Sequence, residues 1–416
     1  MKAETTSSPL GRYRVLDLTD VQGLMCGKIL SELGADVIKI EKPGGDLSRN
    51  NGPFFHDKPH PQKSIHWFAL NANKRSITLN IEYKDGQEIF KKLIKAADFI
   101  IESLSPGYLV NLGLDYSELS KTNPKIILTS ITPFGQSGPY KDYKGCDIVY
   151  EALGGFMYCS GDPDRAPLRI SVEQAYLQAG AQAAAATMIA HYYRLQTGEG
   201  QFIDISIHEA AVQAAQWSSF WWEGAKHLVH RAGNRAYRAG FSPRIIWPCK
   251  DGYFSWRIFV AQHGLRTKAM VDWMNSEGMG TKLKDIVWES LDFNQVSVEQ
   301  FIAWEQEFSP FFLQHTKSEL FEEAGKRGFI LFPANDIKDI AENRHLQARG
   351  FWTQIEHPEL GTSLTYPGAT AIKSSELYYG PGLRAPLIGE HNEEVYVREM
   401  GFSKEEMACL TESGVI

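Results

Sequence analysis

Residues 14–40 read RVLDLTDVQGLMCGKILSELGADVIKI and contain the pattern that decides the fold. Two short apolar runs, 14–18 and 36–40, flank a stretch from 24 to 33 whose apolar residues have helical spacing. Gly34 follows in the position typical of a helix end. This order predicts a strand, a helix and a second strand, the unit from which parallel sheets are built.

The same alternation continues along the first half of the chain. Further strands are expected at 76–80, 99–101, 125–130 and 202–207, and an amphipathic helix at 84–95. Together these segments predict an α/β fold with a parallel, doubly wound sheet.

The second half of the chain has a different character. Eight tryptophans lie between 217 and 304, and the strand-helix rhythm fades there; aromatic crowding of this kind is typical of a core or an interface. A chain of 416 residues also exceeds what one core usually spans. We therefore expect two domains. Residues 1–224 and 331–416 together form the large domain, and residues 225–330 form a small domain inserted between these two parts.

Loops that follow parallel strands are the expected ligand sites. Ligands bind beyond the carboxyl ends of such strands, so 19–22 and 41–45 are candidate ligand loops. No GxGxxG pattern follows the first strand, which disfavours a dinucleotide site.

Composition excludes several classes of protein. The chain has 43 Lys and Arg against 50 Asp and Glu, a net charge of −7, which disfavours a nucleic-acid partner. Five scattered cysteines without CxxC spacing predict reduced, mostly buried thiols and neither a metal site nor disulfides. No apolar run approaches the roughly 20 residues of a membrane span, and the first residues lack a signal-peptide core. We expect a cytoplasmic protein that is not bound to membranes.

Residues 166–200 predict a long central helix. From 176 to 194 helix formers and small residues dominate, Gly198 and Gly200 close the segment, and 179–186 read AGAQAAAA, which suits a helix packed in the core. Helix N-termini favour a carboxylate or a bound anion. The residues at this entrance are Glu173, Gln174 and Tyr176.

Short motifs in one order carry a family resemblance that covers nearly the whole chain. They are VLDLT at 15–19, LGADVIKIE at 33–41, NKRSI at 73–77, FGQSGP at 134–139, TGEGQ at 197–201, HPELG at 357–361 and APLIGEH at 385–391. The chain resembles the family III CoA-transferases, the group of the formyl-CoA and crotonobetainyl-CoA transferases. It is most similar to a non-catalytic subunit of a heteromeric enzyme such as benzylsuccinate CoA-transferase. The resemblance implies a Rossmann-like large domain built from both chain ends, a smaller central domain and an interlocked, threaded dimer.

The family's reaction depends on a residue whose place Tyr176 takes in this chain. In the family an aspartate attacks the acyl-CoA thioester and then carries CoA as an aspartyl thioester, a form of covalent catalysis. Counting back from the TGEGQ motif places Tyr176 on that aspartate. A phenol with a pKa of about 10 is a poor nucleophile at neutral pH and has no carbonyl through which to carry CoA.

Other acidic residues offer partial substitutes. Glu173 is the candidate catalytic residue, although capping and helix-dipole effects also explain a glutamate at this place. Asp162 and Asp164 fit turn chemistry better than catalysis, and Asp147 fits a structural hydrogen-bonding role at a helix start. Cys146 stands where the family's racemases have the histidine that moves a proton, which disfavours a racemase.

The resemblance implies that coenzyme A or an acyl-CoA is the cosubstrate, without a metal. The implied CoA-binding residues are Val21, Gln22, Lys42, Lys74, Arg75 and Ser103. Some of these residues have an alternative that stays open. Gln22 could instead cap the next helix, and Lys42 could be a solvated surface lysine. Lys74 and Arg75 could form a surface ion pair. Asn111 replaces an arginine that holds phosphate in the family, so the site is expected to be weakened.

Two functions follow from these observations. The first is a subunit of an acyl-CoA:carboxylate CoA-transferase that lacks its own aspartate and supports a homologous catalytic subunit. The second is a self-sufficient CoA-transferase, or another acyl-CoA enzyme, that uses Glu173. Four arginines, Arg231, Arg235, Arg238 and Arg244, suit either a carboxylate substrate or an acidic surface of a partner.

Overall fold

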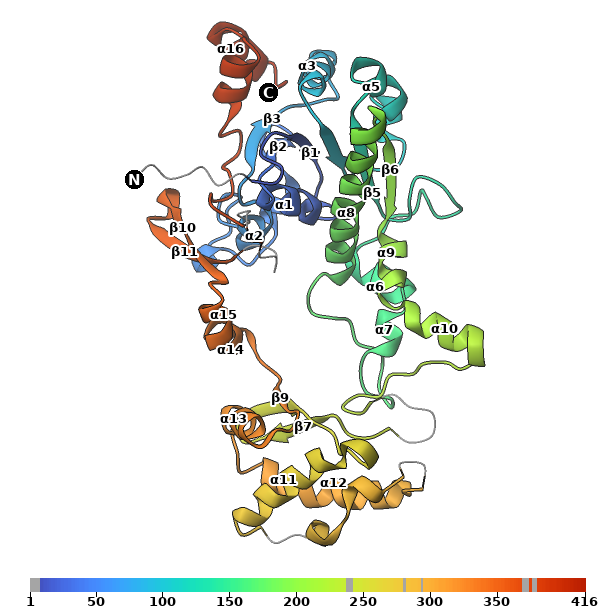
Figure 1. Cartoon of the computed structure of the whole chain (residues 1–416). Helices are drawn as coiled ribbons and strands as arrows, with labels where there is room; N and C mark the ends of the chain where they lie inside the picture. The colour runs from blue at the N-terminus through green and yellow to red at the C-terminus, as the bar shows by residue number, and fades with distance from the viewer. Residues whose placement is uncertain (1–7, 237–241, 280–281, 293–294, 369–373, 376–379) are drawn as a thin grey trace. The chain divides into compact units, whose positions relative to one another are not determined.

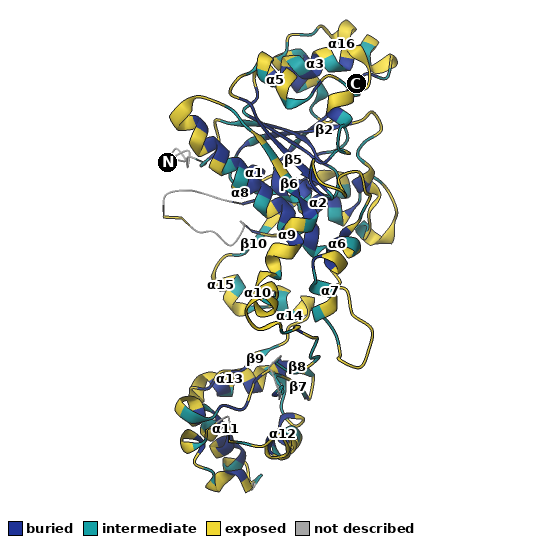
Figure 2. Ribbon diagram, turned by 90° about the vertical axis from the view of Figure 1, so that its right-hand side faces the viewer, coloured by how far each residue is buried: buried dark blue, intermediate teal, exposed yellow. Residues whose placement is uncertain are grey.

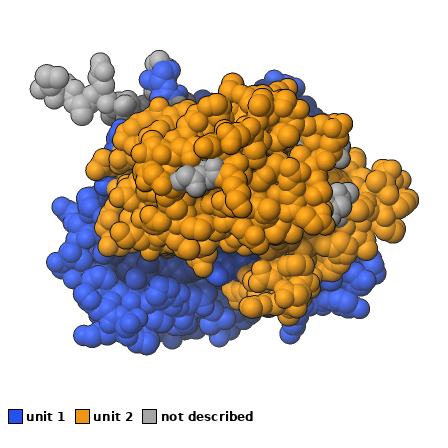
Figure 3. Space-filling view, turned by 90° about the horizontal axis from the view of Figure 1, so that it is seen from below, with its two compact units in different colours: residues 1–156, 170–216, 345–416 blue, residues 157–169, 217–344 orange. Residues whose placement is uncertain are grey.

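The computed structural model describes residues 8–236, 242–279, 282–292, 295–368, 374–375 and 380–416. The chain forms two compact units (Figure 3). Unit 1 consists of residues 1–156, 170–216 and 345–416, and unit 2 of residues 157–169 and 217–344. Arg238 lies outside the described residues.

A six-stranded parallel sheet forms the centre of unit 1 (Figure 1). Its order is β3-β2-β1-β4-β5-β6, and every neighbouring pair is parallel. The strands are β1 (Arg14–Leu18), β2 (Asp36–Glu41), β3 (Arg75–Thr78), β4 (Phe99–Glu102), β5 (Ile127–Thr132) and β6 (Phe202–Ser206). All six were predicted, with shifts of one or two residues at some ends, and the α/β fold is confirmed.

The alternation of side chains along the strands gives two apolar cores. Leu16 and Ile38 belong to the core with α3 and α5, whereas Val15 and Val37 belong to the core with α1 and α8. Strands β1, β2, β4 and β5 are buried on both faces, as is usual for parallel sheets, whereas the edge strand β6 has exposed residues on one face (Figure 2). The helices are α1 (Leu24–Glu32), α3 (Lys84–Lys95), α5 (Tyr116–Thr122), α6 (Asp147–Leu153), α8 (Gln174–Thr197), α9 (Ile207–Ala214) and α16 (Lys404–Glu412).

Helix α8 is the long helix predicted from the sequence, and its small residues serve close packing. A Cβ at Gly180 would lie 2.6 Å from the Cβ of Met25 in α1, so only glycine allows this approach. Gly198 ends the helix in the left-handed conformation, with φ of 81°. The helix belongs to the core on one face only, because Ile189, Tyr192 and Leu195 are 71%, 66% and 62% exposed.

Residues near the C-terminus complete unit 1. The backbone N–H of Thr78 donates to Asn392 at 2.9 Å, and the Tyr396 hydroxyl donates to the Thr78 carbonyl at 2.7 Å. Both chain ends thus contribute to one core. The remaining elements are η1 (Leu47–Asn50), η2 (Phe55–Asp57), α2 (Ile65–Asn71), α4 (Tyr108–Asn111), β10 (Trp352–His357), η6 (Pro358–Leu360), β11 (Thr362–Pro367) and the π-helix η7 (Glu393–Glu399).

Unit 2 has an aromatic core. Five of the eight tryptophans between 217 and 304, namely Trp247, Trp256, Trp273, Trp288 and Trp304, pack in it. Its elements are α10 (Gln216–Ala225), β7 (Ile246–Cys249), β8 (Gly252–Ser255), η3 (Ala261–His263), α11 (Gly264–Ser276), η4 (Lys282–Asp285), η5 (Trp288–Ser290), α12 (Val298–Phe312), α13 (Lys317–Arg327), β9 (Phe332–Pro333) and α14 (Ile337–Ala341). Two short helices, α7 (Phe156–Cys159) and α15 (Arg344–Ala348), stand where the chain passes from one unit to the other.

The five cysteines are free thiols. The prediction that most of them are buried is wrong, because only Cys26 and Cys249 are buried, whereas Cys146 and Cys409 are exposed. Cys146 is the N-cap residue of α6 and Cys409 lies on the exposed side of α16, and the spacing of the cysteines reveals neither position. Within the described part of the chain, no helix is long and apolar enough to cross a bilayer.

Candidate active site

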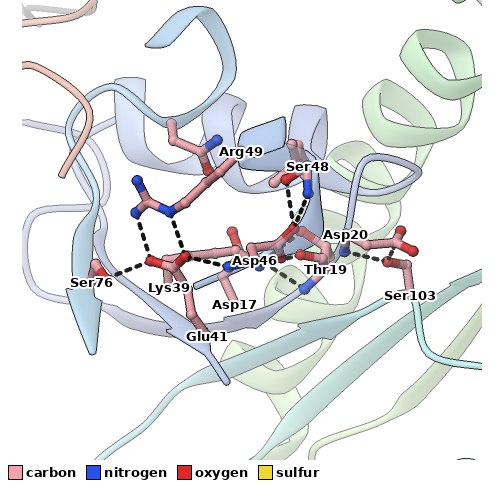
Figure 4. Close-up of polar contacts among 12 residues, drawn as sticks. Asp17, Thr19, Asp20, Lys39, Glu41, Asp46, Ser48, Arg49, Ser76 and Ser103 are labelled. Atoms are coloured by element: carbon pink, nitrogen blue, oxygen red, sulfur yellow. Dashed lines mark hydrogen bonds and ion pairs between the residues drawn. The ribbon is translucent and has the colours of Figure 1, made fainter. Parts of the chain in front are cut away.

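The sheet order reverses between β1 and β4, so the crevice beyond their carboxyl ends is the expected ligand site. The predicted ligand loop 19–22 meets Ser103, a predicted CoA-binding residue, at this edge (Figure 4). The backbone N–H of Asp20 donates to the Ser103 hydroxyl at 2.7 Å, and that hydroxyl donates to the Asp20 carboxylate at 2.7 Å. Val21 packs half-buried on the core, and the Gln22 backbone N–H donates to Asp20 at 3.0 Å. The structure thus brings Val21, Gln22 and Ser103 together.

A buried network of charges lies beneath these loops (Figure 4). Arg49 forms two bonds to Glu41, at 2.6 and 2.7 Å, and the Ser76 hydroxyl donates to the same carboxylate at 2.6 Å. Lys39 lies 3.2 Å from Asp46 and also donates to the Thr19 carbonyl. Several residues of the VLDLT, IKIE and NKRS motifs therefore hold the carboxyl edge of the sheet together.

Lys74 belongs to the same network. Its ammonium group lies 2.8 Å from Asp17 and 2.9 Å from Asn71, and the side chains of Lys74 and Asp17 are both fully buried. Burial by itself raises the pKa of Asp17, but the charges of Lys74 and Lys39 outweigh it and hold that pKa below its usual value. The positive charge of Lys74 is thus neutralised by the carboxylate of Asp17 inside the protein.

The other two predicted CoA-binding cations also have acidic partners. Arg75 forms ion pairs with Asp36 at 2.6 Å, Glu394 at 2.9 Å and Glu399 at 2.5 Å, which connect the sheet to η7. Lys42 lies at the surface, 2.8 Å from Glu82. The Tyr108 hydroxyl donates to the same Glu82 at 2.8 Å.

The entrance of α8 is capped by a residue from another helix. Asp147, at the start of α6, accepts from the backbone N–H groups of Ala175 at 2.9 Å and Tyr176 at 3.3 Å. The structural role predicted for Asp147 is confirmed. Its carboxylate meets the positive end of α8, where the family resemblance implies the nucleophile.

Tyr176 is buried in the first turn of α8. Its ring lies 6.1 Å from that of Tyr150, and the Tyr150 hydroxyl donates to the Gln22 side chain at 3.3 Å. The loop after β1 and the α8 entrance therefore meet through Tyr150, which sequence patterns did not single out. Burial raises the pKa of Tyr176 above its usual value, so its phenol is even less ionised than in water.

Two buried carboxyl groups lie one turn apart on α6. Asp147 Oδ2 and Glu151 Oε1 are buried and accept no hydrogen bond from the described residues. Burial, with the charge of Glu151 adding to it, raises the pKa of Asp147 to about 6.

Glu173 stands at the N-cap of α8, but its side chain makes no capping hydrogen bond. It is 41% exposed and lies 3.2 Å from Nε2 of His66 in α2. Nδ1 of His66 is buried and has no hydrogen-bond partner among the described residues. The capping explanation for Glu173 is therefore wrong, since Asp147 does the capping and Glu173 pairs with an imidazole.

Glu102 is a further acidic group that sequence reasoning missed. It ends β4, is 3% exposed and lines a cavity of about 370 Å³. Burial raises its pKa to about 7. The sequence signal was its place at the carboxyl end of a predicted strand, and only the structure shows that this strand lies where the sheet order reverses.

Comparison with known proteins identifies the relatives of the chain. The subunit BbsE of succinyl-CoA:(R)-benzylsuccinate CoA-transferase from Thauera aromatica is 34% identical over 97% of each chain. The beta subunit of succinyl-CoA–L-malate CoA-transferase from Chloroflexus aurantiacus is 30% identical over 100% of each. The crystal structure of a CAIB/BAIF family protein from Brucella suis has a TM-score of 0.80 at 28% identity, covering 94% of this chain and 99% of that one.

A sequence model of one family also spans the sheet, the α8 entrance and the loops described above. It matches residues 10–392, which is nearly the whole chain. The resemblance inferred from the motifs is thereby confirmed. The chain belongs to the CoA-transferase family III.

Proposed function

We propose that this chain is a subunit of an acyl-CoA:carboxylate CoA-transferase that lacks its own carrier carboxylate and supports a homologous catalytic subunit. The observation that carries the proposal is Tyr176 at the α8 entrance, buried and with a raised pKa. The N–H groups at this entrance already bind Asp147.

The transfer chemistry explains why a phenol does not serve. A carboxylate oxygen attacks the thioester carbon and expels CoA as a thiolate, which leaves a mixed anhydride. The thiolate then attacks the enzyme's own carbonyl carbon, releases the product acid and forms an enzyme thioester. A tyrosine has no carbonyl carbon, so the second step has no place to occur.

The predicted CoA contacts of this chain support the same proposal. Lys42, Lys74 and Arg75 each pair with an acidic side chain of the protein itself. A phosphate would have to displace these partners, so we infer that CoA binds mainly to the catalytic subunit. Two relatives are named as subunits and as acting with succinyl-CoA, which makes succinyl-CoA the first donor to test.

Exposed apolar side chains support close association with a homologous subunit, in the interlocked manner that the family resemblance implies. Tyr192 and Leu195 on α8 are 66% and 62% exposed, and Phe220 on α10 is 72% exposed. Apolar faces of this kind mark protein interfaces.

A self-sufficient enzyme is the second candidate. It is favoured by Glu173, which does not cap its helix and is partly exposed beside His66. In that enzyme Glu173 would be the nucleophile and the carrier of CoA.

CoA exchange between succinyl-CoA and a panel of aromatic and dicarboxylic acids separates the two candidates. We expect no exchange from this chain alone and full exchange after addition of a homologous family III subunit that carries the aspartate. Replacement of the catalytic aspartate in that subunit should abolish exchange, whereas Tyr176→Phe and Glu173→Gln in this chain should change it by less than about twofold. Exchange by the lone chain that Glu173→Gln abolishes would instead establish the second candidate.

A further inference from the structure

The cavity that Glu102 lines belongs to unit 1 and has a volume of about 370 Å³, at the lower end of the range of small-molecule sites. Its walls come from the segment after β4, the start of α5 and the strands β5 and β6. None of the predicted CoA-binding residues is among the described residues that line it. The cavity is therefore distinct from the predicted CoA contacts.

Most of the cavity wall is apolar. Leu109 and Leu128 are buried, whereas Val110 and Phe202 are 62% and 43% exposed. The ring of Tyr116 lies 6.2 Å from that of Phe202, so two aromatic rings stand side by side in the wall. A ligand with an apolar body would cover these side chains and remove their surface from water, which favours binding.

The charged side chains of the wall are acidic. They are Glu102, which is 3% exposed, and Asp115, which caps α5 by accepting from the Ser117 backbone N–H at 2.9 Å. The described residues that line the cavity include no lysine, arginine or histidine. A lining of this kind has a negative potential, which attracts a cation and repels a carboxylate.

Glu102 differs from other buried acids at this edge of the sheet. Asp17 lies 2.8 Å from Lys74, and Glu41 lies 2.6 Å from Arg49. Among the described residues, no lysine, arginine or histidine pairs with Glu102. A buried carboxylate without a cation is costly in free energy, and a cation that enters the cavity offsets this cost.

The groups around Glu102 are neutral donors and further acids. The backbone N–H of Leu104 donates to its carboxylate at 2.6 Å, and the Ser130 hydroxyl also bonds to it. Burial raises the pKa of Glu102 to about 7, and the charges of Asp20 and Asp204 act in the same direction. The hydrogen bonds hold the carboxylate in place without neutralising its charge.

We propose that this cavity binds a small organic cation, a primary ammonium with an apolar body, with the ammonium on Glu102 and the body against Leu128 and Phe202. An ammonium group has three N–H donors for a carboxylate, and the faces of aromatic rings attract it as well. A hydrated inorganic ion would leave the apolar wall uncovered. The inference does not rest on the proposed function, because neither CoA nor a carrier carboxylate enters it.

Binding to the full-length protein, in the assembly in which it is purified, tests the inference. Calorimetry at about pH 8, where Glu102 is mostly ionised, compares three probes. Phenethylammonium has both the charge and the apolar body, phenethyl alcohol keeps the body without the charge, and ethylammonium keeps the charge without the ring. We expect phenethylammonium to bind at least about tenfold more tightly than either of the others. Equal binding of phenethylammonium and either control probe, or no binding of phenethylammonium, overturns the inference.

Glu102→Gln tests the charge while keeping the shape of the side chain and an acceptor for Leu104. This variant should weaken phenethylammonium binding about tenfold and change phenethyl alcohol binding by less than about twofold. A variant that had lost its fold would lose both probes, so this difference between the probes identifies the carboxylate. Unchanged binding of phenethylammonium to Glu102→Gln would contradict the proposed site.

Matched arginine variants test the place of binding without a change in the core. Val110→Arg adds a positive charge to the exposed part of the wall and should weaken phenethylammonium binding about threefold to tenfold. Val287→Arg is the control, since Val287 is 63% exposed, belongs to unit 2 and does not line the cavity. Equal effects of the two arginine variants, or no effect of Val110→Arg, would refute the inference. If no amine binds and Val110→Arg weakens only association with another subunit, a protein covers this surface and the inference fails.

Discussion

Replacement of Lys74 by methionine tests whether the lysine of the NKRS motif holds the fold together. The substitution removes an ammonium group 2.8 Å from Asp17 and leaves that fully buried carboxylate with Lys39 at 3.8 Å and with the Thr19 hydroxyl and backbone N–H. Removing one partner of a buried ion pair costs about 3–5 kcal/mol. Because Lys39 and Thr19 remain, we expect a loss near the lower end, about 3 kcal/mol.

The measurement is urea unfolding, followed by circular dichroism, together with the thermal midpoint. A loss of about 3 kcal/mol corresponds to a decrease in midpoint of roughly 6–12 °C for a unit of this size. Lys42→Met is the matched control, because its ion pair with Glu82 is exposed, and it should cost less than about 1 kcal/mol. Adding Asp17→Asn to Lys74→Met removes the unmatched charge and should recover more than about 1 kcal/mol.

The reasoning would be refuted if Lys74→Met changed the free energy of unfolding by less than about 1 kcal/mol and weakened CoA binding more than about tenfold. That result would make Lys74 a ligand contact, as the family resemblance implies, and would mean that Asp17 is satisfied without it.

Three further substitutions test the α8 entrance, the packing of α8 and its C-terminal cap. The pKa of Asp147 in the folded protein is about 6, above its value in the unfolded chain. Between about pH 4 and 6 the folded protein therefore binds a proton at Asp147 that the unfolded chain has lost. The free energy of unfolding falls as the pH rises through this window. Asp147→Asn keeps an acceptor for the α8 N–H groups and should flatten that part of the pH–stability profile; an unchanged slope would contradict the assignment. Gly180→Ala should cost about 1–3 kcal/mol, since the new Cβ would lie 2.6 Å from Met25 Cβ and 3.0 Å from the Cys26 backbone nitrogen. Gly198→Ala meets no atom within 4 Å, so its cost measures only the left-handed conformation at φ of 81°. A stability unchanged or raised by Gly180→Ala would show that α8 does not need glycine at its contact with α1.

Local patterns were sufficient for the elements of unit 1. The predicted strand 14–18 and helix 84–95 coincide with β1 and α3, and Gly198 ends α8 as expected. The spacing of apolar residues and the capping residues determine a helix or strand from positions only a few residues apart. They can therefore be read from a single sequence.

The contacts at the candidate site were only partly predictable. The ligand loops followed from a general rule about parallel sheets, and Val21, Gln22 and Ser103 do lie together. Whether they contact CoA stays a prediction, as it does for Lys42, Lys74 and Arg75. The partners of these cations, and the pairing of Glu173 with His66 across 107 positions, had no local signal.

The sequence by itself determined the parallel sheet and the long α8 helix, and it predicts that Tyr176 takes the place of the family's aspartate. Only the tertiary structure decided that Asp147 caps α8, that Glu173 turns to His66 and that Lys74 pairs with Asp17. The physical reason is that helix and strand periods depend on neighbouring residues. The partner of a buried charge depends on which distant segments the sheet order brings together.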